Sequence, residues 1–349
     1  MCKVGAGMKT AVVGVSMADV EREDVEWLWD RRIPRGKITN IEGDPDEGKS
    51  ALVLDLAARA STGRRMPFDP RPRRPAAGVV LMVAEDDLED TVRPRLEAAR
   101  ADLALVRAVT PNDIAPIPKG IPAIRRALQS VDAQWLYIDT LPSFVSDRVR
   151  MRDGHSVRRL VLAPLAEVAK DMGIGVVVLR HLNKQRRISH AKYRGLDSIA
   201  FVAAARSALL AAPDPQNSDR KILAPIKHNL CAAPPALAYA LVARGGTVRV
   251  KWLEETEYTA DELLAQGLQN EKPSAGEYAI GFLRGVLADG PRAARMSRKK
   301  AREARIADRT LDRAKAALGV VSEMMTSDPD DVHWVWRMPG RPAVRKAAG

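Results

Sequence analysis

Residues 43–50, Gly43-Asp44-Pro45-Asp46-Glu47-Gly48-Lys49-Ser50, satisfy the pattern G-x-x-x-x-G-K-[ST]. A β-like run, Lys37–Glu42, precedes them, and apolar residues at helical spacing follow in Ser50–Ala60. In a strand–loop–helix context, backbone N–H groups and the helix N-terminus surround a phosphate. Lys49 then reaches the β- and γ-phosphates, and Ser50 ligates Mg²⁺. The stretch, continued to Ala51, therefore predicts a binding site for ATP and Mg²⁺.

Two carboxylates inside this loop are unusual. Asp46 and Glu47 stand where a polyphosphate would approach. They could repel it, or Glu47 could lie outside the loop. Asp46 does tolerate a left-handed backbone better than most residues other than glycine.

The sequence around the loop predicts an α/β domain with a mainly parallel sheet flanked by helices. Apolar runs typical of buried strands lie at 78–84, 135–138 and 174–179. Helical patterns alternate with them at 88–101, 121–130 and 157–172. Later β-like runs at 208–211, 221–226 and 247–252 would extend the sheet.

The length of 349 residues suggests two domains. We expect a tail at 1–24, the α/β domain at 25–255, a linker at 256–275, a small helical domain at 276–340 and a basic tail at 341–349. The two cysteines, Cys2 and Cys231, cannot form a disulfide framework. The apolar runs are too short to span a membrane. We therefore expect a cytoplasmic protein without a membrane partner.

Two expected strands end in carboxylates that suit phosphate chemistry. Asp139 ends the run 134–139, where it would hold Mg²⁺ through water at the carboxyl end of the sheet. Glu85 follows the run 79–84 and is our candidate for orienting the attacking water. Its neighbours Asp86 and Asp87 could instead cap the next helix. His181 ends another strand and could sense the γ-phosphate, although such histidines are often structural.

With these residues in this order, the chain resembles the RecA-like ATPases. Within that group it is most similar to the branch of plasmid RepA-type hexameric replicative helicases and AAA-family ATPases of phages and integrated elements. The resemblance covers about residues 25–255. The segments that carry it are Trp27–Lys37, Ala84–Asp87, Tyr137–Leu141, His181–Lys184, Arg194-Gly195, Ala205–Ser207 and Lys227–Asn229.

The resemblance implies roles for four residues besides Lys49. Glu85 would be the catalytic glutamate and His181 the residue coupled to the γ-phosphate. Arg206 and Lys227 would be candidates for reaching the nucleotide of a neighbouring subunit, so hydrolysis would require an oligomer, expected as a ring. The chain departs from the family at Asp46, where glycine is frequent, and at Asn229, where related ring helicases often carry arginine. A structural salt bridge is the alternative role for Arg206.

Basic residues point to DNA, single-stranded or duplex, as a partner. The net charge is +12, and residues 284–315 hold eleven basic residues against four acidic ones. Two further basic segments follow Asp139 and His181, and in RecA-like rings the corresponding loops face the central channel. The candidates in these two segments are Arg148, Arg150, Arg152, Lys184, Arg186, Arg187, Lys192 and Arg194. Ordinary solvated loops are the alternative.

The C-terminal domain resembles a winged helix-turn-helix, with helices at 279–288, 293–305 and 304–318 and a β-strip at 332–337. Such a fold places its second helix in the major groove. Leu311, Ala314 and Leu318 form the expected buried stripe, which leaves Arg309, Arg313 and Lys315 available to a groove. A protein-docking module is the alternative.

These features together predict an ATP- and Mg²⁺-dependent ATPase that acts on DNA as an oligomeric, replicative-helicase-like motor of a phage, plasmid or integrated element. A GTPase is disfavoured, because 183–186, Asn-Lys-Gln-Arg, lacks the aspartate that reads guanine. The alternative is a nucleotide-switched DNA-binding regulator or loader that unwinds nothing. No other replication protein is indicated as a partner.

Overall fold

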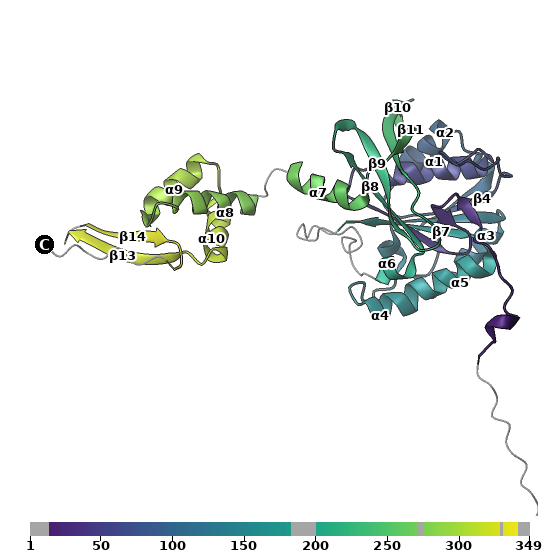
Figure 1. Cartoon of the computed structure of the whole chain (residues 1–349), viewed down its shortest axis with the longest axis horizontal. Helices are drawn as coiled ribbons and strands as arrows, with labels where there is room; N and C mark the ends of the chain where they lie inside the picture. The colour runs from purple at the N-terminus through teal and green to yellow at the C-terminus, as the bar shows by residue number, and fades with distance from the viewer. Residues whose placement is uncertain (1–13, 183–199, 271–274, 329–330, 341–349) are drawn as a thin grey trace, which may run out of the picture. The chain divides into compact units, whose positions relative to one another are not determined.

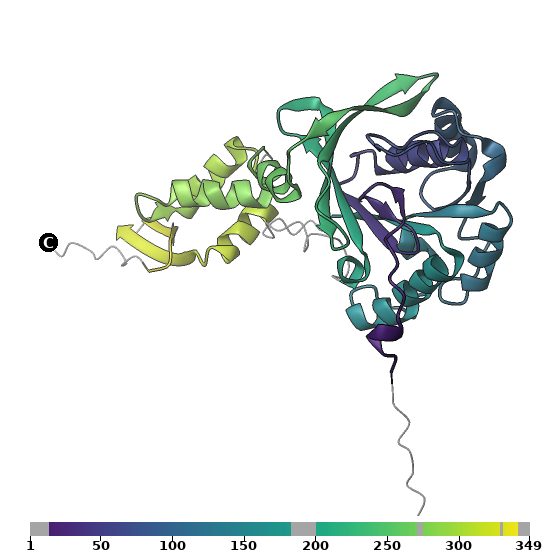
Figure 2. The same cartoon turned by 45° about the vertical axis from the view of Figure 1, so that its right-hand side comes forward.

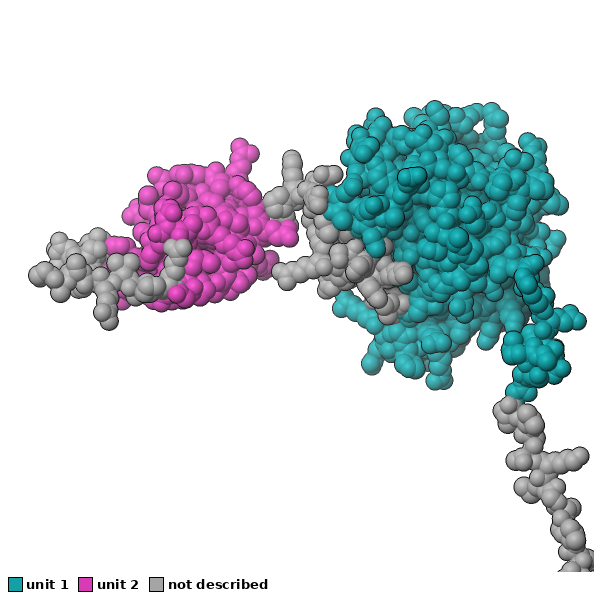
Figure 3. All heavy atoms as spheres, viewed as in Figure 1, with its two compact units in different colours: residues 1–269 teal, residues 270–349 magenta. Residues whose placement is uncertain are grey.

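The computed structural model describes residues 14–182, 200–270, 275–328 and 331–340. The chain divides into two compact units, residues 1–269 and residues 270–349, which Figure 3 colours separately. Within the described residues, no helix is both long enough and apolar enough to cross a lipid bilayer.

The first unit is built on a nine-stranded sheet with the order β11-β10-β9-β8-β3-β7-β6-β4-β5. Its strands are β3 (Ile38–Gly43), β4 (Gly78–Val83), β5 (Val106–Val109), β6 (Ala133–Asp139), β7 (Gly175–His181), β8 (Ser207–Asp214), β9 (Asn217–His228), β10 (Ala236–Arg244) and β11 (Thr247–Thr256). The strands from β8 to β5 in this order are parallel, and β9, β10 and β11 add an antiparallel extension. A short hairpin of β1 (Trp27–Trp29) and β2 (Ile33–Pro34) precedes the sheet.

Helices cover both faces of the sheet (Figures 1 and 2). Helices α1 (Lys49–Ser61) and α2 (Arg93–Ala98) pack on one face, and α3 (Ile121–Gln129), α4 (Gly154–Val157), α5 (Ala163–Met172) and α6 (Ala200–Ala204) pack on the other. The predicted class, a mainly parallel α/β sheet flanked by helices, is confirmed. Two strands of this sheet were not predicted: β5 is a short, half-exposed edge strand, and β10 is rich in alanine, which favours helix.

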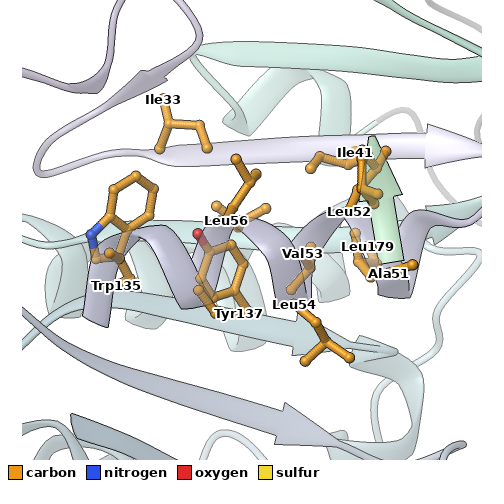
Figure 4. Close-up of a cluster of buried hydrophobic side chains, with 14 of the residues drawn as sticks. Ile33, Ile41, Ala51, Leu52, Val53, Leu54, Leu56, Trp135, Tyr137 and Leu179 are labelled. Atoms are coloured by element: carbon orange, nitrogen blue, oxygen red, sulfur yellow. The ribbon is translucent and has the colours of Figure 1, made fainter. Parts of the chain in front are cut away.

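Helix α1 is buried on nearly every side, as a helix that is apolar all round must be. Leu52 and Leu56 pack against the sheet beside Ile41, Tyr137 and Leu179 (Figure 4). Trp252 of β11 also contacts this helix and donates a hydrogen bond from Nε1 to Asp55 Oδ2 over 2.7 Å. The antiparallel extension therefore packs against the same helix as the parallel strands.

A buried ion pair joins two central strands on the other face. Arg180 of β7 donates to Glu42 Oε1 over 2.6 Å, and both side chains are at most 5% exposed. The Arg180 guanidinium also lies 4.3 Å from the ring centroid of Phe201 in α6. Burial raises the pKa of Glu42, because desolvation outweighs the attraction of Arg180. Each strand ends within one residue of this pair, at Gly43 and at His181.

The segment expected as a linker, residues 256–275, contains helix α7 (Ala260–Asn270). Ala260, Leu263 and Leu264 are buried against the antiparallel strands. Thr259 and Glu262 form a capping box, in which the Thr259 N–H donates to Glu262 Oε2 over 2.8 Å and the Glu262 N–H donates to Thr259 Oγ1 over 3.2 Å. The compact first unit therefore extends to residue 269.

The second unit contains three helices and a three-stranded sheet. Its elements are α8 (Ala275–Val286), β12 (Arg292–Ala293), α9 (Ala294–Glu303), α10 (Asp308–Ala317), β13 (Val321–Asp328) and β14 (Asp331–Arg337), with the sheet order β12-β14-β13. Leu311 and Ala314 are buried, and Leu318 packs against their cluster, as the predicted stripe requires. Arg305 has a φ of 57° and lies between α9 and α10.

We predict that Arg180→Met lowers the free energy of unfolding by about 3–5 kcal/mol, because it leaves the Glu42 carboxylate buried without its arginine. The loss should be larger at pH 8 than at pH 6. Without Arg180 the pKa of Glu42 in the folded state rises further above its unfolded value. The folded state then binds the extra proton, and stability falls as the pH rises.

Denaturant titrations at the two pH values measure this effect. The double variant Arg180→Met/Glu42→Leu is the control, and it should recover part of the loss because no carboxylate remains. A loss that is the same at both pH values would contradict the interpretation.

Candidate active site

The phosphate loop connects β3 to α1 and needs glycine at both ends. A Cβ on Gly43 would lie 2.5 Å from the carbonyl oxygen of Ala211 in β8. Gly48 has a φ of 73°, and a Cβ there would lie 2.8 Å from Leu241 Cδ1 in β10. Asp46 has a φ of 67°, so this aspartate adopts the left-handed conformation that it tolerates. The loop backbone therefore has the shape in which N–H groups can surround a phosphate.

Lys49 begins α1 with a buried side chain. Its Nζ donates to the carbonyl oxygens of Gly43 at 3.0 Å and Asp44 at 2.7 Å. Burial lowers the pKa of Lys49, because desolvation outweighs the attraction of the carboxylates around it. The ammonium thus lies directly on the loop, where it can hold an anionic phosphate.

The two predicted metal residues are in contact. Ser50 Oγ donates to Asp139 Oδ2 over 2.5 Å, although 89 residues separate them. Burial raises the pKa of Asp139, and the nearby carboxylates of Glu85 and Asp86 act in the same direction. A hydroxyl and a carboxylate in contact suit Mg²⁺, which usually takes one or two carboxylates and completes its shell with water and phosphate. The ion would neutralise charge on the phosphates when bound.

Glu85, Thr140 and His181 converge at the carboxyl ends of β4, β6 and β7. Glu85 Oε1 accepts a hydrogen bond from Thr140 Oγ1 over 2.8 Å, and Glu85 Oε2 lies 3.9 Å from His181 Nε2. The Glu85 side chain is 54% exposed. An exposed carboxylate that another side chain holds in place can orient a water and take its proton. Thr140 was not predicted as a site residue, although it lies directly after Asp139 in the segment Tyr137–Leu141 that carries the resemblance.

The neighbouring acids have other contacts. Asp86 forms an ion pair with Arg95 of α2 at 2.8 Å. Asp87 precedes the helical turn 88–92 without a side-chain capping bond. Within the loop, Asp44 and Asp46 are exposed, whereas Glu47 is buried against strands β9 and β10.

Arg206 and Lys227 lie away from the end of the strands that carries the phosphate loop of their own chain. The Arg206 N–H donates to the carbonyl oxygen of Ile38, whereas Gly43 pairs with Ala211. Five residues of strand separate these levels, or roughly 16 Å. Arg206 is exposed. At that separation the Arg206 side chain does not reach the phosphate loop of its own chain.

Unlike the exposed Arg206, Lys227 forms hydrogen bonds with its ammonium within its own chain. Its Nζ donates to the carbonyl oxygens of Val202 at 2.6 Å and Ala205 at 2.8 Å, at the C-terminal end of α6. A cation there satisfies carbonyl groups that the helix leaves unpaired. In this structure Lys227 therefore holds the C-terminal end of α6. Its role toward the nucleotide of a neighbouring subunit stays a prediction.

The predicted DNA-binding residues fall into three groups. Arg148, Arg150 and Arg152 are exposed in the segment after β6, and Arg309 and Arg313 are exposed on α10. Lys184, Arg186, Arg187, Lys192 and Arg194 lie outside the described residues. Lys315 is half-buried and contacts the sheet of its own unit, and its availability to a DNA groove stays a prediction. Its Nζ donates to Ser322 Oγ over 2.6 Å and lies 4.7 Å from the ring centroid of Trp336.

Comparisons with known proteins identify a family. A family model described as an AAA domain matches residues 8–187. Among solved structures, the chain is similar to a KaiC-like protein from the hyperthermophilic archaeon Pyrococcus horikoshii, with 15% sequence identity and a TM-score of 0.43. That similarity covers 64% of this chain and 95% of the archaeal one. No curated protein matches the chain significantly.

We predict that Glu85→Gln lowers kcat for ATP hydrolysis by about 10²–10⁴-fold and leaves ATP affinity nearly unchanged, because it removes the proton acceptor. Thr140→Val should lower kcat by roughly tenfold, since the carboxylate stays but loses the bond that orients it. Steady-state turnover and equilibrium nucleotide binding measure the two effects separately. A Glu85→Gln protein with unchanged turnover would remove this glutamate from the reaction.

Proposed function

Because this chain belongs to the AAA domain family and is an ATPase, we propose that it acts on DNA as an oligomeric, replicative-helicase-like motor of a phage, plasmid or integrated element. Lys49, Ser50 and Asp139 would hold Mg²⁺ and ATP, and Glu85 would activate water. His181 would register the γ-phosphate. The second unit would dock on DNA as a winged helix-turn-helix.

The exposed cations of α9 and α10 carry the DNA part of this proposal. Asp308 and Asp312 pair with Arg298 and Arg302. Within the described part of the chain, the remaining exposed cations here form no ion pair: Arg295, Lys299, Lys300, Arg305, Arg309 and Arg313. A cluster of unpaired cations on neighbouring helices suits a phosphate backbone.

The position of Arg206 supports the oligomer. Arg206 is exposed at the end of the strands opposite the phosphate loop, too far from the nucleotide of its own subunit to contact it. It can contact the nucleotide of a neighbouring subunit if that subunit presents its phosphate loop to this end of the sheet. An arginine supplied in trans stabilises the charge that develops in phosphoryl transfer.

The nucleotide-switched regulator or loader remains a second candidate function, because both candidates use the same phosphate loop and carboxylates. Strand displacement on a forked duplex separates them. A motor unwinds the fork with ATP and stops with Lys49→Ala, whereas a switch binds the fork without unwinding it.

We predict that Arg309→Ala/Arg313→Ala weakens binding to duplex DNA of different sequences alike and lowers the slope of log K against log salt by about 2, if each arginine contacts one phosphate. Fluorescence anisotropy over a salt series measures both quantities. The matched control is Arg244→Ala/Arg249→Ala, which removes the same charge from exposed positions on β10 and β11. Equal losses in the two double variants would contradict a specific role for α10.

We predict that Arg206→Ala keeps ATP binding but lowers kcat by roughly a hundredfold or more, because the neighbouring nucleotide loses its arginine. Mixing this variant with Lys49→Ala subunits should restore part of the turnover, since the latter supply Arg206 to intact phosphate loops. The turnover of mixtures at varied ratios tests this. Full activity of Arg206→Ala alone would exclude the arginine from the reaction.

A further inference from the structure

Glu47 creates an electrostatic problem within the phosphate loop. It lies two residues before Lys49, and its side chain is 10% exposed. Burial raises the pKa of Glu47, because a charged carboxylate is poorly solvated there. A carboxylate without a partner at this position would repel the phosphates of a bound nucleotide.

Two strands of the antiparallel extension meet this residue. Lys221 Nζ of β9 lies 2.8 Å from Glu47 Oε2. The Tyr239 hydroxyl of β10 donates to the carbonyl oxygen of Glu47 over 2.7 Å. Lys221 and Tyr239 are direct cross-strand partners in the β9–β10 pairing. One pair of facing residues therefore holds both the side chain and the backbone of Glu47.

The next loop residue, Gly48, also faces β10. A Cβ there would lie 2.8 Å from Leu241 Cδ1, so Leu241 would have to shift to make room. Tyr239 is fully buried, and the Lys221 side chain is 20% exposed. These contacts direct the Glu47 carboxylate toward β9, so it does not compete with a bound anion for the loop N–H groups.

We propose that Lys221 is a positioning residue for nucleotide binding: it neutralises Glu47 and holds it against β9, which makes an acidic phosphate loop compatible with a polyphosphate. Lys221 does not touch the reacting atoms. It acts through Glu47, and its effect grows with the charge of the nucleotide.

The test compares ATP and ADP affinities of the full chain, measured by competition with a fluorescent nucleotide in the presence of Mg²⁺. Lys221→Ala should weaken ATP binding at least tenfold and ADP binding less, because the unpaired Glu47 carboxylate repels the more highly charged ligand more strongly. Lys221→Arg should retain affinity. Lys251→Ala, which removes an exposed lysine from β11, is the matched control and should change nothing.

The decisive variant is Lys221→Ala/Glu47→Gln, which should bring ATP affinity back to within about threefold of the wild type, since no carboxylate is left to repel the phosphates. Equal losses for ATP and ADP that Glu47→Gln does not restore would overturn the proposal and leave Lys221 with a purely structural role. Should Lys221→Ala not fold, Glu47→Gln alone decides. The proposal expects it to bind ATP as well as the wild type or better, and a tenfold loss would overturn it.

Discussion

The burial of helix α1 is the constraint on which the rest of the structure depends. Its first turn carries Lys49 and Ser50, so any movement of the helix would move the phosphate site. Leu52 and Leu56 pack the helix against the sheet, and Trp252 of β11 donates a hydrogen bond to its Asp55. Ser50 therefore lies within hydrogen-bond distance of Asp139, and the two candidate metal ligands are in contact.

The two parts of the sheet contribute in different ways. The parallel strands bring Asp139, Glu85 and His181 to one end of the sheet, where the carboxyl ends of the strands meet. The antiparallel strands contribute no residue to this set, but they contact the loop through Lys221 and Tyr239. They also engage Lys227 in capping α6, next to the exposed Arg206. The extension thus contacts the phosphate loop at one end of the sheet and α6 at the other.

Much of the site was predictable from sequence because its signals are local. The phosphate loop is one contiguous motif, and an acid that follows a strand of a parallel sheet lies at the carboxyl end of that sheet. The contacts of Lys221, Lys227 and Lys315 were not predictable, because each depends on a partner whose position only the folded chain determines. Lys221 meets Glu47 across 174 residues, and Lys315 is held by Ser322 and Trp336. Helix α7 did have a local signal, the capping box at Thr259 and Glu262, but its polar surroundings suggested a linker.

Measuring ATP hydrolysis with and without DNA tests directly whether this ATPase is a motor that acts on DNA. Turnover is measured alone, with single-stranded DNA and with duplex DNA at two salt concentrations, and Lys49→Ala gives the background. For a motor, we expect DNA to stimulate hydrolysis strongly at low salt and weakly at high salt, because salt screens the contacts between basic side chains and DNA phosphates. Slow hydrolysis that neither form of DNA changes, despite normal ATP binding, would contradict the motor and favour the nucleotide-controlled switch.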